Sequence, residues 1–443
     1  MTARRKVLIA GAAGRDFHDF NVLHRNDRSC EVVAFTAAQI PGIDRRRYPP
    51  ALAGALYPDG IPIVPEAELE AQVREHGVDE VVLAYSDLAH PEAMHLASRA
   101  IAAGASFVLP GPRATMLRAA VPVIAVCAVR TGAGKSPVSR WLSRRLRGLG
   151  FRCAVLRHPM PYGDLAAQAV QRFASLADLD RAGCTVEERE EYEPHLAAGS
   201  TVWAGVDYAR IAQEAAREAE VILWDGGNND FPFLHPGLMV VLADALRPAQ
   251  ADTHHPGEAC LRMADVIVLS KADAAPAADV ASLAMACRRL NSRAAIVRGA
   301  MPVRLDAPDA VRGRRVVVVE DGPTLTHGGM AHGAGHAAAR AAGAGAIVDP
   351  RAAAAPEIAA LYAQYPHIGA VLPAVGYSPA QLEALRATLN AVRADVIVSA
   401  TPADLSRLVA LDKPVVRARY AFEELDTPGL WARVEALLVS RDG

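Results

Sequence analysis

The chain has 443 residues, a formal net charge of −2, a hydrophobic content of 51% and six cysteines. The length predicts two or three domains, and the near-neutral charge excludes a global electrostatic attraction to nucleic acid or to an anionic membrane. No apolar run reaches the roughly 18 residues that span a bilayer, and the cysteines form no CxxC pair. We therefore expect a cytoplasmic protein with reduced thiols.

Apolar strand patterns alternate with helical patterns along the whole chain. The first block contains predicted strands at 6–10, 31–35, 80–85 and 106–111, with helices at 66–76 and 91–103. The second block contains predicted strands at 121–129, 152–157, 220–224, 238–243, 265–270 and 294–299. The third block contains a strand that begins near residue 314 and strands at 346–350, 368–373, 394–402 and 414–420. This alternation is typical of parallel sheets covered by helices, and it predicts three domains with bounds 1–118, 119–308 and 309–443.

The first block opens with the segment GAAGRDFHDFN, residues 11–21, directly after a predicted strand. Ala13 replaces the second glycine of a dinucleotide-binding GxGxxG motif, and no acidic residue ends the second strand, so a dinucleotide is not expected. Arg15 and His18 beside the loop suit a phosphorylated ligand. The alternative is a plain strand-to-helix turn with solvated charges.

The second block opens with the segment VRTGAGKS, residues 129–136, between a predicted strand and a predicted helix. The segment matches the phosphate-loop pattern GxxxxGK[ST] except that Val129 replaces the first glycine. Its glycines allow backbone N–H groups to approach phosphate oxygens, its lysine reaches the β- and γ-phosphates, and its serine ligates Mg²⁺. The predicted nucleotide-binding residues here are Thr131, Gly132, Ala133, Gly134, Lys135 and Ser136. Lys135 and Arg130 are the predicted catalytic cations, and a plain glycine-rich turn is the alternative.

Two later segments of the second block support a P-loop NTPase. Asp225 ends an apolar strand, where a Walker-B carboxylate would act in catalysis and hold Mg²⁺ together with Ser136. Residues 270–273, SKAD, resemble the NKxD base motif of GTPases, with Lys271 and Asp273 as nucleotide-binding residues. The serine leaves ATP and GTP both open. The sequence thus predicts an α/β fold: a central P-loop NTPase domain with a mostly parallel sheet, flanked by N- and C-terminal Rossmann-like α/β domains.

Further polar clusters supply candidate substrate-binding residues. They are His158 and Tyr162 in RHPMPYGDL, Glu258 and Arg262 in HPGEACLRMAD, and His327 in EDGPTLTHGGM. The charged stretch 184–195 is expected to be a solvated helix face. His332 and His336 are spaced as a metal pair would be, but no third ligand is evident. We expect the glycine- and alanine-rich stretch 332–345 to be a loop that leads into a packed helix.

Ten segments, spread in order over nearly the whole chain, resemble the cyclic 2,3-diphosphoglycerate synthetase family. They are ARRKVLIAGAAGRDFHDFN, AVRTGAGKS, RHPMPYGDL, CTVEEREEYEPH, WAGVDY, WDGGNNDFPF, PGEACLRMADVIVLSKAD, VVVEDGPTLTHGGM, YPHIGAVLPAVGY and SATPADLSRLV. Two places depart from the family's pattern: Ser270 replaces an asparagine, and the stretch 243–260 is less basic. Another phosphorylated acid therefore stays open as the substrate.

The resemblance implies an ATP-dependent ligase with Mg²⁺, in which the γ-phosphoryl group activates one phosphate of 2,3-diphosphoglycerate. The neighbouring phosphate would then close a cyclic anhydride, with release of ADP and phosphate. It implies that cations crowd one site, and the candidates are Arg15, His18, Arg130, Lys135, His158, Arg262 and His327. A phosphorylated small molecule is the expected partner, and a homodimer is the expected assembly. The alternative function is a P-loop GTPase with a switch or metallochaperone role.

Overall fold

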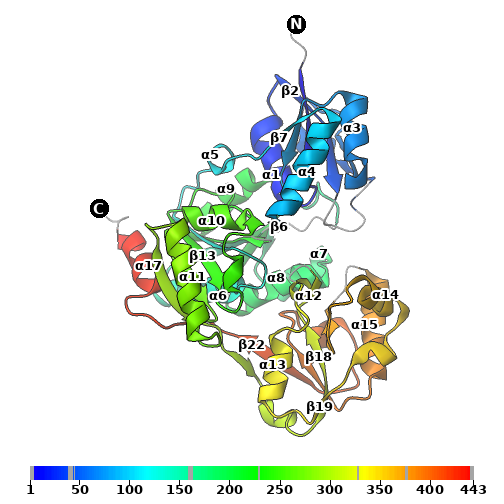
Figure 1. Cartoon of the computed structure of the whole chain (residues 1–443), viewed down its shortest axis with the longest axis vertical. Coiled ribbons are helices and arrows are strands. Elements are labelled where there is room, and N and C mark those ends of the chain that lie inside the picture. The colour runs from blue at the N-terminus through cyan, green and yellow to red at the C-terminus, as the bar shows by residue number, and fades with distance from the viewer. Residues whose placement is uncertain are drawn as a thin grey trace.

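The computed structural model describes residues 4–37, 43, 45–157, 163–227, 230–326, 329–374 and 378–439. Within these residues the longer strands form three sheets, and two short strands, β6 (Leu88–Ala89) and β14 (His254–His255), form a separate ladder. Figure 1 shows the sheets in three units: a blue first unit at the N-terminal end, a green central unit, and a yellow and orange third unit. Each sheet carries helices, so the α/β fold class predicted from the sequence is confirmed.

The sheet of the first unit has the order β3-β4-β2-β1-β5-β7 and is parallel except for the β3–β4 pair. Its strands are β1 (Arg5–Ala10), β2 (Cys30–Ala37), β3 (Arg47–Tyr48), β4 (Ile61–Pro65), β5 (Glu80–Leu83) and β7 (Ser106–Val108). Its helices are α1 (Arg15–Asp19), α2 (Pro50–Ala53), α3 (Leu69–His76), α4 (His90–Ala103) and α5 (Pro112–Thr115). Alternate residues of β1 enter two separate hydrophobic cores, so both faces of this sheet are covered.

The sheet of the central unit has the order β10-β11-β9-β12-β8-β13-β15-β16-β23 and is antiparallel only at its two ends. Its strands are β8 (Val123–Ala128), β9 (Cys153–Arg157), β10 (Gln171–Phe173), β11 (Thr201–Ala204), β12 (Val221–Asp225), β13 (Leu238–Asp244), β15 (Val266–Ser270), β16 (Ala295–Ala300) and β23 (Glu423–Glu424). Its helices are α6 (Lys135–Gly148), α7 (Leu176–Ala182), α8 (Val186–Ala197), α9 (Tyr208–Glu218), α10 (Gly257–Met263), α11 (Ala277–Leu290) and α17 (Leu430–Val439).

The central strand β8 is buried along its whole length, and its side chains alternate between two cores. Val123, Ala125 and Cys127 pack in the core beneath α9, α10 and α11. The intervening residues pack in the core beneath α6 and α17. This arrangement of helices on both faces of a mostly parallel sheet places the loops after the parallel strands at one edge, where ligands of such folds bind.

The sheet of the third unit has the order β17-β22-β21-β18-β19, and β20 also pairs with β18. Its strands are β17 (Val303–Leu305), β18 (Arg315–Glu320), β19 (Ala346–Ile347), β20 (Leu372–Pro373), β21 (Val396–Ser399) and β22 (Val415–Tyr420). Its helices are α12 (Gly322–Thr326), α13 (Ala334–Ala341), α14 (Pro356–Gln364), α15 (Pro379–Ala391) and α16 (Leu405–Leu408). Most of the glycine- and alanine-rich stretch 332–345 is the helix α13 itself, which packs through Ala338 and Ala339, so the expected loop is limited to the ends of the stretch.

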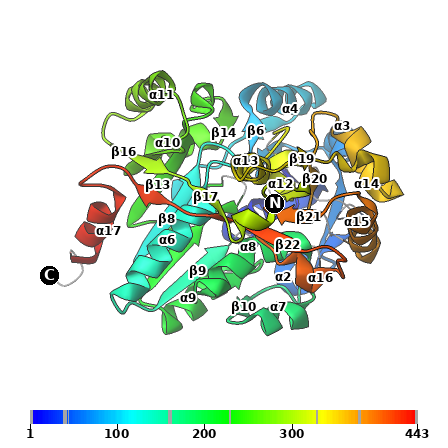
Figure 2. The same cartoon turned by 90° about the horizontal axis from the view of Figure 1, so that it is seen from below.

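After β22 the chain returns to the central unit. β23 pairs with β16, and Leu430, Val434 and Leu438 of α17 pack in the same core as α6. Figure 1 shows α17, in red, beside the green helices, and Figure 2 shows the same placement from below. Residues 423–439 thus pack on the central sheet and not on the third. The domain bounds 1–118, 119–308 and 309–443 stay a prediction.

None of the helices in the described part of the chain is both long enough and apolar enough to cross a membrane.

Candidate functional site

The phosphate loop, residues 129–134, joins β8 to the N-terminus of α6. Gly132 and Gly134 have φ angles of +82° and +100°, which lie in the left-handed region that favours glycine. A side chain at Gly134 would stand only 2.7 Å from the terminal methyl group of Met301. The structure therefore has the strand, tight glycine loop and helix that a phosphate site requires, with the positive end of the helix at the loop.

Asp225 lies at the end of β12, which is next to β8 in the sheet, and its side chain is fully buried. Its Oδ2 is 2.6 Å from Nη1 of Arg157 and 2.8 Å from Nε2 of His195. Burial acts to raise the pKa of Asp225, but its cationic neighbours, Lys135 among them, hold that pKa below its ordinary value. Burial lowers the pKa of Lys135, and Asp225 opposes that shift. The structure thus brings these two predicted catalytic residues close together.

The second carboxylate oxygen of Asp225, Oδ1, is buried and has no hydrogen-bond partner among the described residues. Buried carboxylate oxygens are normally paired. This atom is therefore suited to accept a hydrogen bond from a water molecule bound to a divalent cation. Ser136, the second residue of α6, belongs to the same strand–loop–helix unit. The residues predicted to hold Mg²⁺ are therefore of the right chemistry.

The first unit contributes Asp87 to the phosphate loop, a residue that the sequence analysis missed. Its carboxylate accepts a hydrogen bond from Oγ1 of Thr131 at 2.8 Å and lies 3.4 Å from Nε of Arg130. Asp87 has a φ of +62°, so the backbone is held in a conformation that few non-glycine residues adopt. The predicted cation Arg130 is thus paired with a carboxylate of a different unit.

A second carboxylate, Asp244, organises the other side of the phosphate loop. Its Oδ2 accepts hydrogen bonds from Nζ of Lys271 at 2.7 Å and from Nε of Arg247 at 3.0 Å. Lys271 also donates to the carbonyl of Gly132 at 2.8 Å, and Arg247 donates to the carbonyl of Thr131 at 2.8 Å. These contacts fix the loop from outside. The available sequence signal was that Asp244 ends a buried strand, as Asp225 does.

The remaining residue of the predicted base motif, Asp273, accepts a hydrogen bond from the backbone N–H of Met301 at 3.1 Å. Lys271 and Asp273 therefore lie on the same side of the phosphate loop as Met301, which covers Gly134. Burial lowers the pKa of Lys271, while Asp244 opposes that shift. The motif is connected to the phosphate loop through its lysine.

The glycine loop of the first unit lies at the contact with the central unit, and its charges are buried. Arg15 is 3% exposed and His18 is 2% exposed. The ring of His18 stacks on Phe233 with centroids 4.2 Å apart, and its Nε2 is 2.7 Å from the carbonyl of Thr115. Burial lowers the pKa of His18 to about 4. The alternative of a turn with solvated charges is therefore wrong, because both side chains are enclosed between two units.

The charged helix α8 is buried as well, which corrects the expectation of a solvated helix face. Each of the charged residues from Glu187 to Glu190 is at most 6% exposed. Partners explain the burial: Glu191 pairs with Arg157, and Oε1 of Glu193 is 3.1 Å from Nη1 of Arg189. Sequence alone could not provide these partners, since most of them come from other elements.

α8 also connects the central unit to the third unit. Glu190 accepts a hydrogen bond from Thr401 and contacts Asp321, and Oε2 of Glu193 accepts one from the backbone N–H of Asp404 at 3.0 Å. Burial and the nearby Asp321 raise the pKa of Glu190 well above its ordinary value. Because His195 of the same helix contacts Asp225, the phosphate site and the third unit share one helix.

The other predicted substrate residues are not gathered at the phosphate loop by the contacts described. Oε1 of Glu258 accepts hydrogen bonds from Arg262 at 2.6 and 2.8 Å, and its Oε2 is 3.5 Å from Nε2 of His90. His158, Tyr162 and His327 lie outside the described residues.

The rings of His332 and His336 are 4.2 Å apart. Among the described residues no group of three or more histidine, cysteine, aspartate or glutamate side chains could hold a metal ion. The two histidines therefore have no third ligand in the part of the chain that the structure describes.

Comparisons with known proteins give one relative of nearly equal length. Arginine synthetase ArcE from Thermococcus kodakarensis is 52% identical over 427 residues, which are 96% of this chain and 95% of that protein. A tetraacyldisaccharide 4'-kinase from Anaeromyxobacter dehalogenans is 31% identical over 229 residues, 46% of this chain and 57% of that protein. LpxK from Aquifex aeolicus, solved with ATP, superposes with a TM-score of 0.41 and 14% identity over 74% of this chain and 90% of its own. No model of a known protein family matches the chain.

Proposed function

Because the chain belongs to the family of arginine synthetase ArcE, we propose that it is an ATP-dependent synthetase that completes the guanidinium group of an amino acid. Membership of that family makes the chain an enzyme, and its central unit has a phosphate loop for a nucleoside triphosphate. The substrate in this proposal is a ureido amino acid, and the third nitrogen of the guanidinium group comes from ammonia.

The proposed reaction has two steps. The ureido oxygen attacks the γ-phosphorus of ATP, and the bond between that phosphorus and the β–γ bridging oxygen breaks to leave ADP. Ammonia then adds to the ureido carbon, the carbon–oxygen bond breaks, and phosphate leaves with both electrons of that bond. The guanidinium retains its positive charge, and one proton is released to water for each ammonium consumed. The protein contributes positioning and charge stabilisation, as in other phosphoryl transfers.

The residues of the phosphate loop supply that stabilisation. Lys135 neutralises charge on the β- and γ-phosphates, and the N–H groups of the loop hold the phosphate oxygens. Mg²⁺, held by Ser136 and by Asp225 through water, would neutralise further charge on the same phosphates. Arg157 and His195 fix the orientation of the Asp225 carboxylate.

The observation that carries this proposal over a bisphosphate substrate is the pairing of the predicted cations. Arg130 lies 3.4 Å from Asp87, and Arg262 lies 2.6 Å from Glu258. A molecule with two phosphate groups needs cations whose charge is not already balanced. A substrate with one carboxylate and a neutral or cationic side chain needs fewer of them.

The second candidate is the synthesis of cyclic 2,3-diphosphoglycerate, which the ten sequence segments favour. Both reactions begin with transfer of the γ-phosphoryl group of ATP to an oxygen of the substrate, and both end with displacement by a neighbouring nucleophile. The P-loop GTPase is the remaining alternative, and it would need no small acid at all.

One assay separates the three candidates. The purified full chain is incubated with Mg²⁺ and either ATP or GTP, and released phosphate is measured with L-citrulline plus ammonium, with 2,3-diphosphoglycerate, or with neither. We expect phosphate release with ATP, L-citrulline and ammonium together, and L-arginine in the products by mass spectrometry. A cyclic anhydride signal by phosphorus NMR would establish the second candidate instead. Slow GTP hydrolysis that no substrate changes would establish the GTPase. Light scattering on the same sample tests the predicted homodimer.

A further inference from the structure

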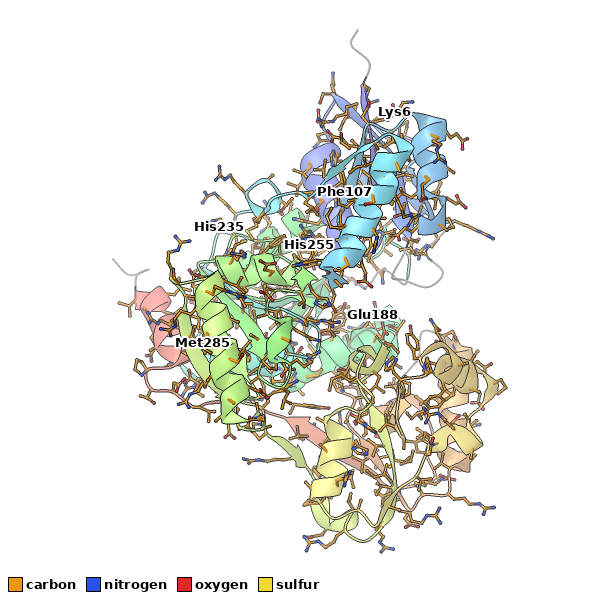
Figure 3. All side chains as sticks on the ribbon, in the orientation of Figure 1. Lys6, Phe107, Glu188, His235, His255 and Met285 are labelled. Atoms are coloured by element: carbon orange, nitrogen blue, oxygen red, sulfur yellow. The ribbon has the colours of Figure 1, made fainter. Side chains whose placement is uncertain are left out.

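The contact between the first unit and the central unit contains charged side chains whose hydrogen-bonding capacity is not used. Arg15 and Asp19 belong to α1, and His255 belongs to β14 (His254–His255) of the central unit. Figure 3 labels His255 where the two units meet. Within the described residues, Nη1 of Arg15, both carboxylate oxygens of Asp19 and Nε2 of His255 are buried without a hydrogen-bond partner.

Arg15 is held firmly although its charge is only partly matched. Its guanidinium carbon lies 4.5 Å from the ring centroid of Phe231, which comes from the loop after β12. Its ion pair among the described residues is long, with Nε of Arg15 3.6 Å from Oδ2 of Asp19. The stacked guanidinium is thus fixed in orientation, and Nη1 is left to bind another acceptor.

Among the described residues, Asp19 is a buried acceptor without a hydrogen-bond donor, as Nη1 of Arg15 is a buried donor without an acceptor. Its side chain is 0% exposed, and burial raises its pKa to about 7, with Arg15 opposing the shift and Asp230 adding to it. Burial likewise lowers the pKa of His255 to about 4, so that its ring is neutral at pH 7. The neighbouring groups of α1 are already engaged: His18 contacts the carbonyl of Thr115, and Asp16 accepts from the backbone N–H groups of Ala13 and Phe17.

This cluster is connected to the phosphate loop by a short path. His255 pairs with Leu88 of β6 (Leu88–Ala89) in an antiparallel ladder. The residue before Leu88 is Asp87, which contacts Arg130 and Thr131 of the loop. The cluster and the phosphate loop are therefore joined through one backbone ladder and the residue Asp87.

Buried polar atoms in folded proteins are paired with protein, water or ligand, and an unpaired buried charge is strongly unfavourable. Here an unused guanidinium N–H and an unused carboxylate lie side by side. A dianionic phosphate would match Arg15 but would face Asp19. A zwitterion matches both, because its carboxylate accepts from the guanidinium and its ammonium donates to the carboxylate.

We infer that Arg15, Asp19 and His255 form the recognition site for the α-carboxylate and α-ammonium groups of an amino acid substrate. Arg15 binds the carboxylate, Asp19 binds the ammonium, and His255 accepts a further N–H of the same group. This inference rests on the proposed function, since it names the part of the substrate that the first unit holds.

Calorimetric titration of the full chain tests the site with three probes: L-arginine, agmatine, which lacks the carboxylate, and the 2-hydroxy analogue of arginine, which lacks the ammonium. We expect the unsubstituted chain to bind L-arginine at least about tenfold more tightly than either analogue, since a charge-assisted hydrogen bond contributes about that factor. Arg15→Lys and Arg15→Ala should abolish the preference over agmatine, and Asp19→Asn should abolish the preference over the hydroxy analogue.

The controls separate recognition from folding and from the reaction. Arg386→Ala removes an exposed arginine that pairs with Glu383 on α15 and should leave all three affinities unchanged. ATP affinity, measured in parallel, should stay within about twofold in every variant that folds. An Arg15→Lys variant that binds ATP normally and keeps the preference for L-arginine over agmatine would overturn the inference, as would an unsubstituted chain that binds none of the probes.

Failure of the recognition site and failure of the proposed reaction give different results. Discrimination by Arg15 and Asp19 without formation of L-arginine from L-citrulline would support the recognition site and reject the guanidinium reaction. Formation of L-arginine with an unchanged KM for L-citrulline in Arg15→Lys and Asp19→Asn would support the reaction and reject the site. Binding of inorganic phosphate that depends on Arg15, with no preference for L-arginine over agmatine, would assign the cluster to an anion alone.

Discussion

The central unit meets its two neighbours by different physical means. At the first interface, with the first unit, β6 pairs with β14 and Asp87 contacts Arg130, so a backbone ladder and opposite charges join the units. At the second interface, with the third unit, Glu190 of α8 meets Asp321, so two carboxyl groups lie in contact. Opposite charges attract without a proton, whereas two buried carboxyl groups must share one. The comparison teaches that partly buried opposite charges join the first unit to the central unit. At the second interface the ion pairs among the described residues are exposed, as between Arg407 and Asp180, and the buried carboxyl groups require a proton.

The largest effect is expected at Lys135, where the two interfaces converge on the nucleotide. Its charge interacts with Asp225, which α8 supports through His195, and with Asp87 of the first unit. Lys135→Ala should reduce nucleotide turnover by roughly 10²–10³-fold, because a charge that stabilises the transferred phosphoryl group is lost. Phosphate release measures the effect.

Lys413→Ala is the matched control for that variant. Nζ of Lys413 donates to the carbonyls of Leu389 and Asn390 in the third unit, so turnover should not change. Full turnover in Lys135→Ala would contradict the assignment of the phosphate loop.

The next largest effect is expected for Asp225→Asn, measured as the free energy of unfolding in urea. The fully buried Arg157 would lose one of its two carboxylate partners and keep Glu191, and breaking a buried pair costs up to about 3–5 kcal/mol. All four tryptophans, Trp141, Trp203, Trp224 and Trp431, lie in the central unit, so their fluorescence reports that unit.

Asp426→Asn provides the comparison for an exposed pair. Asp426 lies 2.6 Å from Arg298, whose side chain is 54% exposed, so the loss should be about 1 kcal/mol or less. Equal losses for the two variants would show that Asp225 is not a structural carboxylate for Arg157.

A smaller effect is expected when stability is measured against pH, because the second interface contains carboxyl groups in contact. Burial raises the pKa of Glu190, of Asp321, and of Glu320, the last to about 6. Carboxyl groups whose pKa is raised in the folded state stabilise it fully below the unfolded value, and that contribution is lost as the pH rises through the folded pKa. The second interface, where Glu190 and Asp321 meet, should therefore weaken as the pH rises, and the third unit should lose the contribution of Glu320 as the pH passes about 6.

Glu190→Gln should flatten this pH dependence, because an amide carries no charge to bury. We expect the unfolding free energy to fall less between pH 5 and pH 8 in the variant, by on the order of 1 kcal/mol. Glu357→Gln, a change on α14 of the third unit at an exposed position, should leave the slope unaltered. If Glu190→Gln does not change the slope of unfolding free energy against pH, protonation of Glu190 does not stabilise the second interface.

The smallest effect is expected for Asp87→Asn at the first interface. Asparagine tolerates the φ of +62° and keeps an acceptor for Thr131, but it loses the charge that faces Arg130. The KM for ATP should change by about two- to fivefold, corresponding to a partly buried ion pair, and the difference should shrink at high salt. A change that is independent of salt would mean that Asp87 acts by shape and not by charge.

The sequence was sufficient for those parts of the molecule that local patterns determine. Strands such as β8 and β12 are continuous apolar runs, and the glycines at 132 and 134 have the positive φ angles that a phosphate loop needs. These features depend on residues that are neighbours in the chain.

The sequence was insufficient where partners come from another unit. The charge of α8 suggested a solvated face, yet Glu190 and Glu193 find Thr401 and Asp404 more than 200 positions away. Asp87 likewise reaches Thr131 from a loop of the first unit. Such pairs leave no periodic pattern in the sequence, and a single chain carries no signal for them beyond a polar residue at the end of a strand.

The return of the chain to the central sheet has a consequence for synthesis. The first sheet is complete once residue 108 has been made, but β23 and the apolar residues Leu430, Val434 and Leu438 of α17 reach the central sheet only after residues 423–439 have been made. Domains fold as units while a chain emerges from the ribosome. The core beneath α6 therefore stays open on the ribosome until residues 430–439 have emerged, and a nascent chain needs protection on that face before it can bind a nucleotide.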